Sequence, residues 1–193
     1  KKYFNEKDIN VDTFNGSLLW EPWNIAKKDG TPYKVFTPYY RKGCLNSDKP
    51  RMPLPIPDLS NLTSIDGHDF KIEDLALLPK QSWHKKMDDL WSPGEVGALG
   101  KIDQFISNGL NDYKEGRNFP FKKNVSQLSP HLHFGEVSPN QVWYRAKTKE
   151  GKLGIKKDLD HFLSELGWRE FSFNLLYHFP FLPKENLQKK FDN

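Results

Sequence analysis

Residues 156–178 read Lys156-Lys-Asp-Leu-Asp-His-Phe-Leu-Ser-Glu-Leu-Gly-Trp-Arg-Glu-Phe-Ser-Phe-Asn-Leu-Leu-Tyr-His178. Apolar side chains recur here at intervals of three and four residues, and at 100° per residue they share one broad face. They are Leu159, Phe162, Leu163, Leu166, Phe173 and Tyr177. This pattern predicts a helix from about Lys156 to His178 with one face in the core.

A second face of this predicted helix carries polar and aromatic side chains that could bind a ligand. Glu165, Trp168, Arg169 and Ser172 stand at i, i+3, i+4 and i+7, so they follow one another along one side. A carboxylate and a guanidinium can hydrogen-bond to the polar edge of a ring, and an indole can stack on its face. The spacing alone favours a simpler alternative, a solvated face with a Glu–Arg salt bridge and a half-buried Trp. Glu170 falls within the apolar arc and needs a buried partner, for which we expect a nearby Arg or His.

Two further helices are predicted before this one. Ser92-Pro93-Gly94-Glu95 has capping-box spacing with Pro at the first helical position, and Gly116 is a suitable end. Apolar residues at helical spacing lie between them: Leu99, Ile102, Ile106, Leu110 and Tyr113. The same start signal at Ser138-Pro-Asn-Gln141 predicts a shorter helix that ends at about Ala146.

The N-terminal half has a different pattern. Residues 14–41 suggest extended structure, because Pro22, Pro32 and Pro38 prevent a long helix. Residues 46–82 hold five prolines and few periodic apolar positions, which is typical of a linker between two compact parts. The predicted fold class is therefore mainly α.

The loop Asn124–Pro130 joins the first two predicted helices. Its short polar residues and free backbone N–H groups would suit a phosphate, although most Ser-rich loops are only turns. Residues 116–135 hold the basic Arg117, Lys122 and Lys123 and no acidic residue. His131 and His133 have no third ligand of matching spacing, so we predict no metal site.

The composition of the chain restricts the class of protein to which it can belong. The chain has 193 residues, 36% of them hydrophobic and 14% aromatic, which is enough for a packed core, and Lys and Arg outnumber Asp and Glu by 29 to 25. One cysteine excludes a disulfide framework, and no apolar run is long enough for a membrane span. With no targeting signal in view, we expect a cytoplasmic location. We also expect a monomer. Since the first residue is Lys, we also expect a fragment.

Several motifs together resemble the DNA photolyase and cryptochrome family. The resemblance is carried by Leu128–Pro139 (Leu-Ser-Pro-His-Leu-His-Phe-Gly-Glu-Val-Ser-Pro) with Gln141–Trp143, and by Phe162–Phe171. Tyr113–Arg117 also fits, while Glu21–Trp23 and Val35–Arg41 resemble the end of that family's N-terminal α/β domain. The resemblance implies a C-terminal remnant of the α/β antenna domain with its last strands (residues 1–45), an interdomain linker (46–90), and the N-terminal part of the helical FAD-binding domain (91–193).

The resemblance also implies roles for individual residues. FAD would be held by Tyr113, Val125, Ser126, Gln127, Leu128, Ser129, Phe162 and Arg169. The chain departs from the family at Val125, where Thr is usual, and at Phe162, where many members carry Trp. Glu165 and Trp168 would be the catalytic pair on the damaged pyrimidines. DNA would be contacted by Arg117 and by the stretch Glu165, Leu166, Gly167, Trp168, Arg169, Glu170, Phe171 and Ser172.

The implied activity is that of a deoxyribodipyrimidine photolyase: reduced FAD passes an electron to a cyclobutane pyrimidine dimer that has flipped out of UV-damaged DNA. An antenna pigment such as a folate or deazaflavin would sit in the missing N-terminal domain. We expect the 193-residue chain alone to be inactive, since the helices that enclose the flavin ring are also missing. The alternative is a cryptochrome-type blue-light photoreceptor without repair activity. A helical nucleic-acid-binding module without a cofactor would leave the collinear motifs unexplained.

Overall fold

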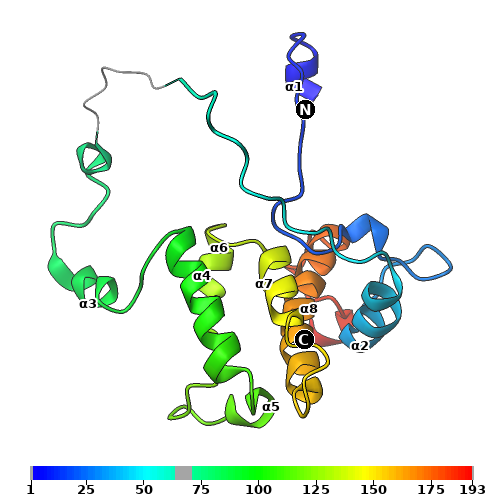
Figure 1. The fold of residues 1–193 in the computed structure, drawn as a ribbon. Helices are drawn as coiled ribbons and strands as arrows, with labels where there is room; N and C mark the ends of the chain where they lie inside the picture. The colour runs from blue at the N-terminus through cyan, green and yellow to red at the C-terminus, as the bar shows by residue number, and fades with distance from the viewer. Residues whose placement is uncertain (1, 64–70, 193) are drawn as a thin grey trace.

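The computed structural model describes residues 2–63 and 71–192, which are 48% helical and contain no strand (Figure 1). The α-helices are α1 Lys2–Asn5, α2 Phe36–Pro38, α3 Lys85–Asp88, α4 Glu95–Gln104, α5 Tyr113–Gly116, α6 Ser129–His133, α7 Pro139–Lys147 and α8 Lys156–His178. Short 3₁₀ or π-helical turns cover Pro22–Asn24, Tyr39–Gly43, Cys44–Asn46, Ile72–Leu75, Ser82–His84, Phe105–Gly109 and Lys189–Phe191. The mainly α fold class is confirmed.

Helix α8 is the central element, and both of its predicted ends are confirmed. It packs against α5, α7 and the turn Tyr39–Gly43, and Figure 1 shows α7 and α8 side by side. Of its predicted apolar face, Leu159, Phe162, Leu163 and Leu166 are buried. The core prediction is wrong for Phe173 and Tyr177, which are 41% and 54% exposed; the Arg169 guanidinium lies over the first ring and the Trp23 ring contacts the second. An edge-to-face pair joins Trp20 to Trp143 of α7, with ring centroids 5.4 Å apart. The N-terminal residues 19–44 therefore complete the core around α8.

Helix α7 begins as its sequence predicts. Ser138 accepts a hydrogen bond from the Gln141 N–H at 3.2 Å, and the Gln141 side chain accepts one from the Ser138 N–H at 2.8 Å. This reciprocal capping box satisfies two of the N–H groups that a helix start leaves free.

The predicted capping box at Ser92 is wrong. Helix α4 begins at Glu95, two residues after the predicted first helical residue Pro93, and the residue before it is Gly94 with φ +92°. The chain folds back so closely that a Cβ on Gly97 would lie 1.7 Å from the carbonyl oxygen of Ser92. The two glycines allow a tight entry that the capping pattern does not anticipate.

The predicted single helix to Gly116 is also interrupted. After α4 comes the π-helical turn Phe105–Gly109, and Asp112 then adopts a left-handed conformation with φ +64° before α5. The Asp158 carboxylate of α8 accepts hydrogen bonds from the N–H groups of Asp112 and Lys114, at 3.0 and 2.8 Å. A tertiary contact thus stabilises the start of α5 and breaks the helical periodicity.

The strands expected within residues 14–41 do not form. Leu19 and Trp20 donate their backbone N–H groups to the buried Glu170 side chain, and not to a neighbouring strand. Further along, the chain makes only short turns at Pro22–Asn24 and Phe36–Asn46. Of the predicted linker, residues 64–70 lie outside the described residues, and 46–63 and 71–82 hold little regular structure. In the described ranges no helix is long and apolar enough to cross a membrane.

Candidate functional site

The outward face of α8 carries an ion pair that joins it to α5. Arg117, directly after α5, donates from Nη1 to Oε1 of Glu165, to Nε2 of His161 at 3.3 Å and to the Tyr113 hydroxyl at 3.4 Å. The Arg117 and Glu165 side chains are about one-third exposed. The pair therefore places a carboxylate and a guanidinium together at the surface, where both retain hydrogen-bonding capacity toward a ligand.

The salt bridge between Glu165 and Arg169 that the spacing favoured is not formed. Arg169 instead donates to the backbone carbonyl of Ser17 at 2.5 Å, and its guanidinium lies 4.9 Å from the centre of the Phe173 ring. Glu165 pairs instead with Arg117, which is distant in sequence. The simpler alternative is therefore wrong about the partner of Glu165, whereas its half-buried Trp is observed at Trp168.

Trp168 lies one helical turn after Glu165 and is 46% exposed. Its indole stacks on the Phe36 ring with centroids 3.8 Å apart and planes 10° from parallel. One face of the indole is thus covered by protein while much of the other faces solvent. Such a half-covered aromatic surface can stack on a further flat ring.

Glu170 has different surroundings from Glu165, since it is only 2% exposed. Its carboxylate accepts from the N–H groups of Leu19 at 2.8 Å and Trp20 at 3.2 Å, with Arg169 at 3.4 Å. Burial raises the pKa of Glu170 to about 7, although these hydrogen bonds act in the opposite direction. The expected Arg partner is present, but two backbone amides make the shorter contacts.

Burial reduces the number of residues in the predicted DNA-binding stretch Glu165–Ser172 that can contact DNA. Leu166, Gly167, Glu170 and Phe171 are buried in this structure, so these residues cannot form an outer surface. The motif is continuous in sequence, whereas a helix packed against a core exposes only one side. The exposed or half-exposed members are Glu165, Trp168, Arg169 and Ser172.

The loop Val125–Leu128 has the features expected for binding an anion. Its backbone N–H groups donate no hydrogen bond to any described residue. Gln127 has a left-handed φ of +54° and Leu128 follows in the right-handed region, an alternation that brings successive N–H groups together. The donor set therefore fits the diphosphate of a dinucleotide such as FAD.

Basic side chains surround this loop. Val125, Ser126 and Gln127 line a cavity of about 680 Å³ together with Lys101, Lys122 and Lys123. Lys101 donates to Oε1 of Gln127 at 3.0 Å, and Lys122 pairs with Asp112 at 2.9 Å. The positive charge expected from the sequence thus lies beside the loop.

The other residues expected to hold FAD lie elsewhere. Tyr113 and Phe162 pack with Phe105 in a buried cluster, with centroids 4.7 to 5.5 Å apart. Burial raises the pKa of Tyr113. Ser129 and Arg169 line a separate cavity of about 580 Å³, and Leu128 is buried. The structure thus distributes the predicted flavin residues over adjoining places and does not gather them in one cavity.

Three residues at the site were not predicted to act there. Lys101 faces the anion loop from α4, and His161 contacts Arg117 and lies one turn before Glu165. The i−4 spacing of His161 to Glu165 was the available signal. Phe36 lies 132 positions before Trp168, so no local pattern connects them.

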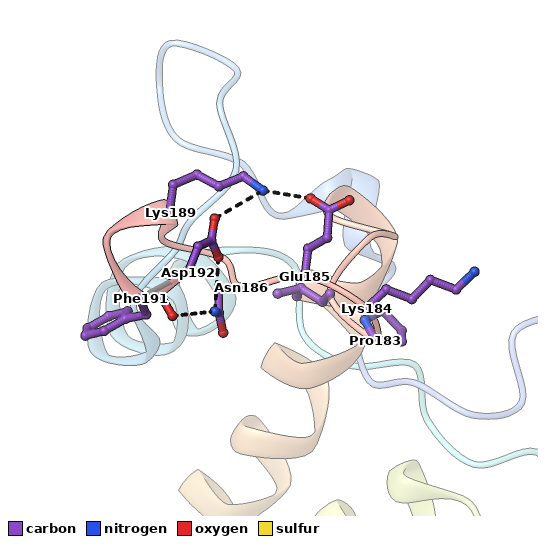
Figure 2. Close-up of a pocket in the computed structure, with 8 residues that line it drawn as sticks. Pro183, Lys184, Glu185, Asn186, Lys189, Phe191 and Asp192 are labelled. Atoms are coloured by element: carbon purple, nitrogen blue, oxygen red, sulfur yellow. Dashed lines mark hydrogen bonds and ion pairs between the residues drawn. The ribbon is translucent and has the colours of Figure 1, made fainter.

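Two further clusters of charged side chains lie outside the predicted site. A concavity near the C-terminus is lined by side chains that pair with one another: Lys189 with Glu185 at 2.7 Å and Asp192 at 3.6 Å, and Asn186 with Asp192 at 3.1 Å (Figure 2). Their polar groups are occupied and none belongs to a predicted site. Nδ1 of buried His131 contacts Glu136 at 2.5 Å, and within the described ranges no three His, Cys, Asp or Glu residues are grouped for a metal.

Comparisons with known proteins agree with the motifs. The family model for DNA photolyase matches residues 1–58. Over 193 residues, the whole chain is 40% identical to a deoxyribodipyrimidine photo-lyase of Agrobacterium fabrum. A crystal structure of a bacterial class III photolyase from Agrobacterium tumefaciens superimposes with a TM-score of 0.87 at 40% identity, over 99% of this chain.

This chain belongs to the DNA photolyase and cryptochrome family. Cryptochrome-2 of Arabidopsis thaliana is also similar, with 32% identity over 202 residues and 97% of this chain. The chain spans 40% of the Agrobacterium fabrum enzyme, 32% of the cryptochrome and 39% of the solved photolyase. The helical fold is therefore that of part of the helical domain of a photolyase.

Proposed function

We propose that this chain supplies part of the lesion-binding and flavin-binding surface for light-dependent repair of cyclobutane pyrimidine dimers. The observation that carries the proposal is the outward face of α8, where the Arg117–Glu165 pair lies one turn from the half-covered Trp168 indole. A pyrimidine offers a flat apolar face and an edge of carbonyl and N–H groups. The indole can stack on such a face, and the polar pair can hydrogen-bond to such an edge.

In this proposal each group has a distinct task. Trp168 stacks on the flipped dimer, Glu165 hydrogen-bonds to its edge, and Arg117 holds the carboxylate and contributes positive charge toward the DNA backbone. The partial exposure of all three side chains leaves them accessible. Unstacking is least costly at a damaged step, which favours the dimer over intact DNA.

The proposed cofactor is FAD in its reduced form. The N–H groups of residues 125–128, which donate to no residue within 2–63 or 71–192, and the nearby Lys101 and Lys123 would hold its diphosphate. When bound and excited by light, reduced FAD supplies the electron that opens the cyclobutane ring. An antenna pigment, the monomeric state and a cytoplasmic location remain predictions.

The test is blue-light repair of UV-irradiated oligothymidylate by the protein that the whole reading frame encodes, reconstituted with FAD. Glu165→Ala should abolish most repair and retain flavin, because it removes the hydrogen bond to the lesion and leaves residues 125–128 unchanged. Glu115→Ala is the matched control, since Glu115 is an exposed carboxylate that pairs with Lys157. Repair that is unaffected by Glu165→Ala would contradict the proposal.

The second candidate is a cryptochrome-type photoreceptor, which the similarity to Arabidopsis cryptochrome-2 supports. A photoreceptor would bind FAD and respond to blue light without repairing dimers. The same assay separates the two, because a flavin-loaded wild-type protein that leaves the irradiated DNA unrepaired favours this second function.

A further inference from the structure

The N-terminal segment covers one face of the Trp168 indole, and the indole is part of a stack of three aromatic rings. Phe36 lies between Trp168 and Tyr40, with centroid distances of 3.8 and 5.6 Å and interplanar angles of 10° and 9°. Tyr40 is 1% exposed, Phe36 is half-buried and Trp168 is 46% exposed. The stack therefore extends from the core to the surface.

The sequence of α8 allows this stack to lie close to the helix. Gly167 presents no Cβ to Tyr40, and a Cβ there would come within 2.5 Å of the tyrosine ring. Phe171, one turn further along, lies edge-on to both Phe36 and Trp168, at 6.0 and 5.9 Å. The indole is thus supported on one face and against one edge.

We propose that Phe36 is a positioning residue that holds Trp168 as a rigid, flat stacking surface for a pyrimidine ring. The inference rests on the proposed function for its ligand, and on the ring geometry for its mechanism. An exposed Trp supported only by its own helix would exchange between rotamers, and a ligand would have to immobilise it on binding. The Phe36 ring fixes the plane of the indole beforehand, so this ordering cost is not incurred on binding.

The substitution that tests the proposal removes the flat ring and keeps an apolar side chain. In the full chain, Phe36→Leu should shift the Trp168 indole N–H resonance in a ¹⁵N spectrum, because the ring current of Phe36 is lost. The resonance is assigned by its absence in Trp168→Phe. Phe36→Leu should also weaken binding of UV-irradiated oligothymidylate by about three- to tenfold, the effect expected for immobilising one large side chain.

Phe36→Tyr restores a flat ring and should restore both the resonance and the affinity, which a role in packing volume alone would not require. Phe134→Leu is the matched control, because Phe134 is an exposed phenyl ring paired with His133. Thermal unfolding of each variant shows whether it is folded, and Phe36→Met, unbranched and flexible, repeats the comparison if the leucine variant unfolds.

An unchanged Trp168 resonance in Phe36→Leu would overturn the proposal, as would a shifted resonance with unchanged affinity for the irradiated DNA. Failure of the proposed function gives a different result. In that case the wild-type chain would not distinguish irradiated from unirradiated oligothymidylate, while the spectra without DNA would still report whether Phe36 positions the indole.

Discussion

Glu165 and Glu170 lie five residues apart on α8, and their carboxylates have opposite surroundings. Glu165 is one-third exposed and pairs with Arg117 at the surface, whereas Glu170 is buried and is held by the N–H groups of Leu19 and Trp20. The same chemical group is accessible to a ligand on one face and connects two parts of the core on the other. The difference shows that helix face, and not residue type, separates a candidate binding group from a structural one.

The largest expected effect comes from removing the buried carboxylate. Glu170→Ala leaves two buried N–H donors without an acceptor and opens a cavity, so it should lower the free energy of unfolding by about 3 kcal/mol. Glu165→Ala removes a partly solvated ion pair and should cost less than about 1 kcal/mol. Urea unfolding of both variants measures the contrast, and equal losses would show that the two faces do not differ in this way.

A smaller effect is expected where α8 meets Tyr40. Gly167→Ala places a Cβ 2.5 Å from the tyrosine ring, and the resulting displacement should cost about 2 kcal/mol. Gly100→Ala in α4 is the control, because a Cβ there meets no atom within 4 Å and Ala favours a helix by about 1 kcal/mol. Thermal unfolding should show a lower midpoint for the first variant and a higher one for the second. A stable Gly167→Ala protein would mean that the helix can move away from Tyr40 at little cost.

The most gradual expected effect, the smallest at any one step of pH, is a pH dependence of stability that arises from Glu170. Because its pKa is raised from 4.5 to about 7, the folded protein retains this proton at pH values where the unfolded chain has lost it. The free energy of unfolding should therefore fall as the pH rises from about 4.5 to 7 and level off above, by about 1.4 kcal/mol per pH unit and about 3 kcal/mol in total. The difference between wild type and Glu170→Gln, followed by urea unfolding at each pH, isolates this contribution. A difference that does not change with pH would place the Glu170 pKa near its ordinary value.

Part of the site could be predicted because its members are local. Glu165 and Trp168 share a helix, and the predicted bounds of that helix are those observed. The basic loop also follows from consecutive residues. The partners that complete the site could not be predicted: Arg117 reaches Glu165 across 48 positions, and Phe36 reaches Trp168 across 132. Pairing at such distances depends on how the chain is packed.

The sequence by itself determined the elements whose stability is local: the apolar period of α8, the capping box of α7 and the residue types of the anion loop. The tertiary structure alone decided where neighbouring parts of the chain compete for the same groups. Asp158 interrupts the helix expected to end at Gly116, and Glu170 accepts the N–H groups that a strand at Leu19 would have used. A hydrogen bond within one helix needs only adjacent residues, whereas these bonds exist only after distant segments have been brought together by burial of the core around α8.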